Sequence, residues 1–252
     1  MLKKFLLIML ITVFSFAAIS GCKKSGENAD KSGSAKLIVG TNAEFEPFEY
    51  FDGNKIVGFD IDLMNEIGKV IGKKIEFKNM AFDALLLSLQ SQKIDAIISG
   101  MTATDDRRVH VAFTNPYFVS KQAIIIAEGT PVKVFEDLEG KNIGVVLGYT
   151  GDIAVTEKFK YNSKITRYNG TSEVIIALSS GKIDAAVIDM EPAKNYSAQN
   201  KGLVVLETAL AEEEYSIALR KEDKQLLEEI NKAIDTLKSN GTYDKLVAKY
   251  FN

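Results

Sequence analysis

Three stretches of the chain combine residue types that could hold a small charged molecule. Arg107 follows an apolar run, and an arginine offers a planar fork of donors that matches a carboxylate. The turn 148–151 places two glycines and the Thr150 hydroxyl at an expected helix start, where free N–H groups can hold an anion. Asp189 ends the apolar run 185–188, where a buried carboxylate needs a cation. One anion site and one cation site together describe a site for a zwitterion.

Each of these stretches also has a simpler interpretation. Arg107 lies in the charged run 105–108, which could be a solvated surface segment, and short glycine-containing turns are common. The only histidine, His110, is interpreted as a surface or helix residue rather than as a catalyst. The sequence shows no metal-ligand spacing, no nucleotide-phosphate loop and no Ser/His/Asp or Cys/His set. We therefore predict no catalytic residue, no metal and no cofactor.

The elements that would position these residues follow from hydrophobic periodicity. In the first half the pattern predicts strands at 37–40, 75–77, 95–99 and 124–127, a hairpin turn at 52–54, and helices at 60–71 and 82–90. In the second half it predicts strands at 140–146, 165–168, 183–189 and 216–219, and helices at 152–159, 172–180, 227–237 and 243–250. Strands that alternate with helices over short links predict an α/β fold with parallel sheets covered on both faces.

An internal repeat relates the two halves. The segment 88–100 recurs, altered, at 177–189, and the tetrapeptide Lys-Ile-Asp-Ala appears in both copies at a constant offset, 182 − 93 = 89. Gly100 ends one copy and Asp189 ends the other. The repeat predicts two similar lobes, each with ligand-facing loops at the carboxyl ends of its parallel strands. The cleft between the lobes is the expected site.

The amino terminus is typical of an exported protein. Two lysines precede the apolar run 5–19, which is shorter than the roughly 20 apolar residues of a membrane span, so residues 1–21 are expected to be a secretory signal. The tetrad 19–22 resembles a bacterial lipobox, in which the cysteine is lipidated. Cys22 is also the only cysteine, so no intrachain disulfide is possible. We expect Cys22 to anchor the protein to a membrane.

Residues 22–35 are rich in Ser, Gly, Lys, Asn and Asp and predict a flexible tether. Without residues 1–21 the chain carries 29 basic and 34 acidic residues, a charge of 29 − 34 = −5. This balance, with no basic cluster, argues against nucleic acid or an anionic membrane surface as a partner. The remaining residues, roughly 215, suffice for one large domain or two small ones.

Several motifs resemble one known family, the polar amino-acid-binding proteins of ABC importers (family 3 of the bacterial solute-binding proteins). The motifs are the segments 39–50, 58–63, 97–104, 113–118 and 241–245, and the similarity covers 36–252. The resemblance implies a type II periplasmic-binding-protein fold: α/β, with two similar lobes, mostly parallel sheets and a two-strand hinge. It also implies that Thr102, Arg107 and Thr150 hold the α-carboxylate of an amino acid, while Asp189 and the Gly100 carbonyl hold its α-ammonium.

The same resemblance assigns the side-chain end of the ligand. Phe45 and Phe82 would sandwich it, although the sequence alone favours a core position for each aromatic. Asn42 stands where many members have an aspartate, which removes a fixed negative charge. Glu44 could replace that charge for a cationic ligand, or it could be an exposed loop residue. Tyr149 is bulky where relatives usually carry Thr or Ser, so we expect the site to be narrower at the end that receives the ligand side chain.

The mechanism that the resemblance implies is hinge closure over a free polar amino acid and delivery to a membrane permease. If Glu44 replaces the missing charge, the ligand would be a basic one such as arginine or lysine. One lobe would comprise 36–121 plus 217–252 and the other 122–216, with crossings near 121–124 and 215–217. The protein would be a lipid-anchored monomer on the outer face of the cell membrane or in the periplasm. Because fold does not decide function, an enzyme resembling cyclohexadienyl dehydratase and a ligand sensor remain alternatives.

Overall fold

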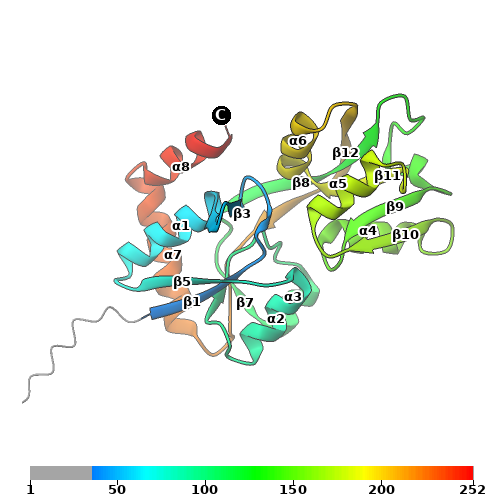
Figure 1. Cartoon of the computed structure of the whole chain (residues 1–252). Coiled ribbons are helices and arrows are strands. Elements are labelled where there is room, and N and C mark those ends of the chain that lie inside the picture. The colour runs from blue at the N-terminus through cyan, green and yellow to red at the C-terminus, as the bar shows by residue number, and fades with distance from the viewer. Residues whose placement is uncertain (1–35, 252) are drawn as a thin grey trace, which may run out of the picture. The chain divides into compact units, whose positions relative to one another are not determined.

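The computed structural model describes residues 36–251, and for residues 208–211 only the backbone (Figure 1). The expected signal 1–21, the tether 22–35 and Cys22 lie outside this range. The first lobe contains the strands β1 (Lys36–Thr41), β5 (Lys74–Asn79), β6 (Ala96–Ile97), β7 (Ala112–Phe113) and β13 (Ala218–Leu219). Its helices are α1 (Phe59–Val70), α2 (Phe82–Gln90), α3 (Asp105–His110), α7 (Lys224–Ser239) and α8 (Thr242–Phe251). A small sheet of β2 (Glu44–Phe45), β3 (Glu49–Asp52) and β4 (Lys55–Val57) carries the expected hairpin.

The second lobe contains the strands β8 (Phe118–Ala127), β9 (Asn142–Val146), β10 (Lys164–Tyr168), β11 (Ala185–Asp189) and β12 (Leu203–Tyr215). Its helices are η1 (Phe135–Leu138), α4 (Thr150–Phe159), α5 (Thr171–Ser179) and α6 (Met190–Gln199). The sheet orders are β5-β1-β6-β13-β7 and β10-β9-β11-β8-β12. In each sheet the first three strands pair in parallel and the last two join antiparallel. The predicted fold of two similar α/β lobes with mostly parallel sheets is confirmed.

The aspartate of the internal repeat performs the same structural task in both lobes. Asp95 donates its N–H to the carbonyl of Ile38 (2.7 Å) and accepts the Ile38 N–H on its carboxylate (2.9 Å). Asp184 does the same with Asn142, at 2.8 and 2.7 Å. Each aspartate therefore ties the start of a central parallel strand to its neighbour. This fixes the register that brings Gly100 and Asp189 to equivalent strand ends.

Two long strands connect the lobes. β8 and β12 pair antiparallel from Phe118 opposite Tyr215 to Ala127 opposite Leu203, and both extend from the first lobe into the second (Figure 1). The expected crossing 121–124 lies in β8, and the expected crossing 215–217 begins at the last residue of β12. The exact lobe bounds stay a prediction.

Some elements differ from the sequence-based expectation. Helix α3 forms over a charged run that has no apolar periodicity, because the Thr104 side chain accepts the Arg107 N–H (3.3 Å) and two acidic residues occupy the first turn. Helix α6 and most of β12 were likewise not expected. The predicted strand 95–99 is shorter, with β6 limited to Ala96–Ile97, although the N–H groups of Asp95 and Ile98 on either side also donate to carbonyls of β1. Within 36–251, none of the helices has both the length and the apolar character of a membrane-crossing segment.

Candidate functional site

Side chains from both lobes and from both connecting strands meet at the carboxyl ends of the parallel strands. The first lobe contributes Thr102 and Arg107, and the second contributes Thr150 and Asp189. The connecting strands add Gln122 from β8 and Glu213 from β12. Four of these six residues were predicted from the sequence.

Arg107 is buried and lies between the two lobes. Its guanidinium donates to the carbonyl of Thr102 (2.8 Å) in the first lobe and to the carbonyl of Gly148 (2.9 Å) in the second. The group also packs on the ring of Phe82, 5.2 Å from the centroid. Burial lowers the pKa of Arg107, while the carboxylates of Glu213 and Asp189 act against this shift, so the group stays charged. A guanidinium has more N–H donors than these two contacts use, which leaves it able to bind an anion.

The two hydroxyls predicted to hold an anion both contact Glu213. Thr102 donates to Glu213 Oε2 (2.8 Å), and Thr150 donates to the same oxygen (2.7 Å). Gln122 donates to Glu213 Oε1 (3.2 Å). The hydroxyls from the two lobes therefore converge on one carboxylate oxygen, close to the Arg107 charge. This geometry is that of a carboxylate-binding site.

Asp189 supplies the opposite charge. Its Oδ1 accepts hydrogen bonds from Gln122 (2.8 Å) and from the Tyr215 hydroxyl (2.8 Å), and only 3% of the residue is exposed. Burial raises the pKa of the Asp189 carboxyl, and the nearby Glu213 carboxylate raises it further, whereas the hydrogen bond from Tyr215 lowers it. A cation that approaches Asp189 would reverse this shift by stabilising the ionised form.

Three aromatic rings form the far end of the site. The ring of Tyr149 contacts Phe45 at 5.4 Å and Phe82 at 4.5 Å between centroids, both edge-on. The Tyr149 hydroxyl donates to Asn42 Oδ1 (3.0 Å), which links the second lobe to the first. Tyr149 thus lies where the ligand side chain is expected between the two phenylalanines. All four side chains are buried.

The loop that carries Gly100 is held from below by two buried acids. Gly100 has φ +49°, and a Cβ there would lie 2.5 Å from Cε1 of Phe45, so only glycine fits. Asp60 Oδ2 accepts from the Gly100 N–H (2.9 Å) and from the Tyr117 hydroxyl (2.7 Å). Glu49 accepts from Ser99 (2.7 Å). Within 36–251 the remaining oxygens, Glu49 Oε2 and Asp60 Oδ1, have no other hydrogen-bond partner, and a proton shared between the two carboxyls satisfies both.

This pair makes stability depend on pH. Burial raises the pKa of Asp60 from 3.8 to about 6, so the folded protein holds a proton on Asp60 more tightly than the unfolded chain does, while burial and the Asp60 charge raise the pKa of Glu49 as well. The stabilisation is present below about pH 4 and is lost as the pH rises through about 6, a loss of about 3 kcal/mol. Thermal unfolding of the wild type and of Asp60→Asn between about pH 4 and pH 8 should show the difference, with Asp62→Asn on the same helix as control. If the unfolding temperatures of the wild type and of Asp60→Asn change with pH in the same way, Asp60 does not cause the pH dependence.

Glu44 lines a cavity that lies beside Asn42, the hydrogen-bond partner of Tyr149. Its Oε2 accepts from the Ser172 hydroxyl of the second lobe (2.8 Å). The cavity has a volume of about 330 Å³, and Asn42, Glu44 and Glu173 are among its lining residues. Glu44 is therefore a negative group on a cavity that Asn42, the hydrogen-bond partner of Tyr149, also lines.

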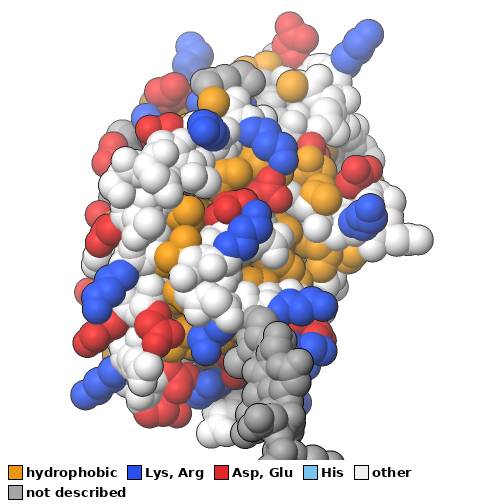
Figure 2. Space-filling model, turned by 90° about the vertical axis from the view of Figure 1, so that its left-hand side faces the viewer, with side chains coloured by type: hydrophobic (Ala, Val, Ile, Leu, Met, Phe, Trp, Pro, Cys, Tyr) orange, Lys and Arg blue, Asp and Glu red, His pale blue; other side chains and the backbone are white. Residues whose placement is uncertain are grey.

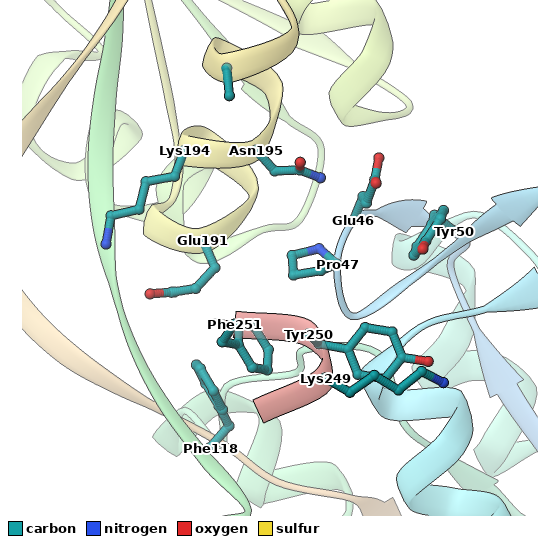
Figure 3. A pocket seen from close by; sticks show the side chains of 11 residues that line it. Glu46, Pro47, Tyr50, Phe118, Glu191, Lys194, Asn195, Lys249, Tyr250 and Phe251 are labelled. Carbon is teal, nitrogen blue, oxygen red and sulfur yellow. The ribbon is translucent and has the colours of Figure 1, made fainter. Parts of the chain in front are cut away.

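A larger cavity of about 760 Å³ lies elsewhere between the lobes. Figure 3 shows its side chains coming from helix α6 on one wall and from helix α8 and the segment 46–50 on the other. Two of its charged groups have partners of their own: Lys249 pairs with Asp62 (2.7 Å), and Glu191 accepts from Ser120 (2.6 Å). None of the predicted ligand residues lines it, so this cavity is not the predicted site.

On the face that Figure 2 shows, basic and acidic side chains are interspersed, with hydrophobic side chains between them. Among residues 36–251, no group of three or more His, Cys, Asp or Glu side chains is arranged to hold a metal ion. His110 lies exposed at the end of α3.

Sequence reasoning missed Gln122, Glu213 and Tyr215. All three lie on the connecting strands rather than in loops at strand ends. Glu213 stands in a run of three glutamates, a pattern that is typical of a solvated strand. The only available signal was the proximity of the expected hinge crossings to these positions.

Comparisons with known proteins agree on one family. The family model described as bacterial extracellular solute-binding proteins, family 3, matches residues 37–252. The arginine-binding extracellular protein ArtP of Bacillus subtilis is 34% identical over 99% of this chain and 98% of its own. A solved ancestral arginine-binding protein bound to arginine is 44% identical, with a TM-score of 0.84 over 86% of this chain and 99% of that chain. An ancestral amino-acid-binding protein, titled a precursor of cyclohexadienyl dehydratase, is 35% identical, with a TM-score of 0.82 over 86% of this chain and 96% of that chain.

Proposed function

The chain belongs to the bacterial extracellular solute-binding proteins of family 3, and from this premise we propose that it captures a cationic amino acid, arginine or lysine, for an ABC importer. The observation that carries this proposal is that the buried Arg107 and Asp189 lie close enough to influence each other electrostatically, while hydroxyls of both lobes converge on the Glu213 carboxylate near the Arg107 charge. Arg107, Thr102 and Thr150 would hold the α-carboxylate. Asp189 and the Gly100 carbonyl would hold the α-ammonium.

The charge balance of the site favours a cation. Arg107 and Asp189 would neutralise the two ends of a zwitterion, and Glu44 adds a negative charge to the lining of the adjoining cavity. A ligand with a cationic side chain would compensate that charge. The relatives named for arginine binding support the same choice.

Transport would use closure of the lobes. Thr102 and Thr150 come from different lobes, so a ligand carboxylate can contact both only when the lobes are together. The ligand would then favour the closed arrangement by its extra affinity for it. The closed monomer would dock on a membrane permease, and the whole chain would act as a binder rather than as an enzyme.

A thermal-shift screen against the twenty amino acids tests this function, because a ligand that binds the folded state raises the unfolding temperature. We expect arginine or lysine to give the largest shift. A screen in which no amino acid shifts the transition would contradict the proposal. Stabilisation by a cyclohexadienyl substrate with turnover would favour the enzyme alternative, which the dehydratase precursor among the structural relatives motivates.

The role of Glu44 can be tested separately from that of the residues that would bind the α-carboxylate. Glu44→Gln keeps an acceptor for Ser172 but removes the charge, so arginine or lysine should bind about tenfold more weakly while glutamine binds as before. Calorimetric titration of each variant measures this. Glu46→Gln, which lines the larger cavity, is the matched control and should change neither affinity. Equal losses for arginine and glutamine would refute a role in selecting cations.

We also propose that residues 1–21 direct export and that Cys22 carries the lipid anchor, with 22–35 as its tether. Cys22→Ser should then move the exported protein from the membrane fraction to the soluble fraction after cell fractionation. Ser25→Ala, in the tether, should leave it with the membrane. A Cys22→Ser protein that still sediments with membranes would disprove the anchor.

A further inference from the structure

Glu213 accepts hydrogen bonds from the two hydroxyls that are expected to bind the ligand carboxylate. Its Oε2 accepts from Thr102 at 2.8 Å and from Thr150 at 2.7 Å, and Gln122 donates to its Oε1 at 3.2 Å. A glutamate side chain ends in the same chemical group as the α-carboxylate of an amino acid. Both hydroxyls assigned to that carboxylate are therefore already directed at a carboxylate of the protein itself.

The contacts of Glu213 also join the two lobes. Thr102 belongs to the first lobe and Thr150 begins helix α4 of the second, while Glu213 lies on β12, which connects them. The Arg107 charge acts on the same carboxylate. Tyr149 makes a parallel connection, because it bonds to Asn42 and contacts Phe45 and Phe82 where the ligand side chain is expected. Glu213 therefore lies where the α-carboxylate of the ligand is expected, and Tyr149 lies where its side chain is expected.

We propose that Glu213 is an internal competitor for the α-carboxylate of the ligand. This inference rests on the proposed function, which assigns Thr102 and Thr150 to that carboxylate. Before binding, Glu213 occupies the carboxylate position and holds the lobes together through the two hydroxyls. The ligand must displace it, so the measured affinity is the intrinsic affinity reduced by the fraction of molecules in which the position is open.

Removal of the competitor should have two effects. Glu213→Ala frees both hydroxyls, so L-arginine should bind about tenfold more tightly if Glu213 occupies the position in about nine molecules of ten. The protein without ligand should also become less compact, because one link between the lobes is lost. Glu213→Gln, which keeps the shape of the side chain but not its charge, should show a smaller gain in affinity.

Calorimetric titration with L-arginine and small-angle X-ray scattering without ligand measure the two effects on the full exported chain. Glu214→Ala is the matched control, since it removes the same charge from the next position of β12, where the side chain is exposed. It should change neither quantity. Circular dichroism checks that each variant is folded, and Glu213→Gln carries the test if Glu213→Ala is not.

If Glu213→Ala binds L-arginine more tightly than the wild type and Glu214→Ala binds it with unchanged affinity, Glu213 competes with the ligand. Equal or weaker binding by Glu213→Ala overturns it, because Glu213 would then help the ligand or be irrelevant to it. If arginine binds neither the wild type nor the variants, the proposed ligand is wrong. In that case scattering alone decides, and an equally compact Glu213→Ala overturns the link between the lobes.

Discussion

Arg107→Ala is expected to weaken amino-acid binding about a thousandfold while the protein stays folded. Arg107 is 7% exposed and bonds to carbonyls of both lobes, at Thr102 and Gly148. Its loss would leave the ligand carboxylate in a buried site without a compensating cation. Removal of one partner from a buried charge pair costs about 3 to 5 kcal/mol, which corresponds to a factor of about 10² to 10³ or more in Kd. Calorimetric titration with L-arginine measures the change.

The neighbouring arginine is a matched control for this prediction. Arg108 lies on the same helix, is exposed, and stacks on Phe113 while it donates to the carbonyl of Ala103 (3.0 Å). Arg108→Ala should therefore leave binding unchanged. Arg107→Lys keeps the charge but loses the planar fork, so it should bind with intermediate affinity. If folded Arg107→Ala binds L-arginine with wild-type affinity, Arg107 does not bind the ligand carboxylate.

Much of the fold could be predicted from hydrophobic periodicity and the internal repeat. Helix α7 buries the face predicted for it, including Ile230, Ile234 and Leu237, because apolar residues recur there at helical spacing. The repeat indicated two equivalent strand starts, and Asp95 and Asp184 make the same pair of bonds to neighbouring strands. Local sequence patterns were therefore sufficient to predict the elements whose formation depends on nearby residues.

The composition of the site depended on contacts that local pattern does not encode. Gln122 and Glu213 reach the site because β8 and β12 pass beside the strand ends, which follows only from the paired path of two strands distant in sequence. Tyr149 could be predicted to narrow the site, but not to contact Phe45 and Phe82 at once, because those contacts come from the other lobe. Similarly, Thr104 rather than any apolar spacing determines helix α3.

Asp189→Asn is expected to weaken binding of amino acids by a factor of about 10² or more. Asp189 is buried and accepts hydrogen bonds from Gln122 and Tyr215 at 2.8 Å, so its carboxylate is oriented before a ligand arrives. Asparagine keeps an acceptor for these donors but cannot neutralise an α-ammonium, and a buried cation without its counter-charge loses about 3 kcal/mol or more. Calorimetric titration with L-arginine measures the loss.

The pH dependence distinguishes lost charge from lost shape. Burial and Glu213 raise the pKa of Asp189, and a bound ammonium would lower it, so binding to the wild type should release protons and weaken as the pH falls. Titrations in buffers with different ionisation enthalpies detect the released protons. Asp189→Asn should release fewer, whereas Asp184→Asn, at the start of the same strand, should match the wild type. If Asp189→Asn binds as tightly as the wild type with the same proton release, the ammonium lies elsewhere, because a neutral amide at this position could not have held it.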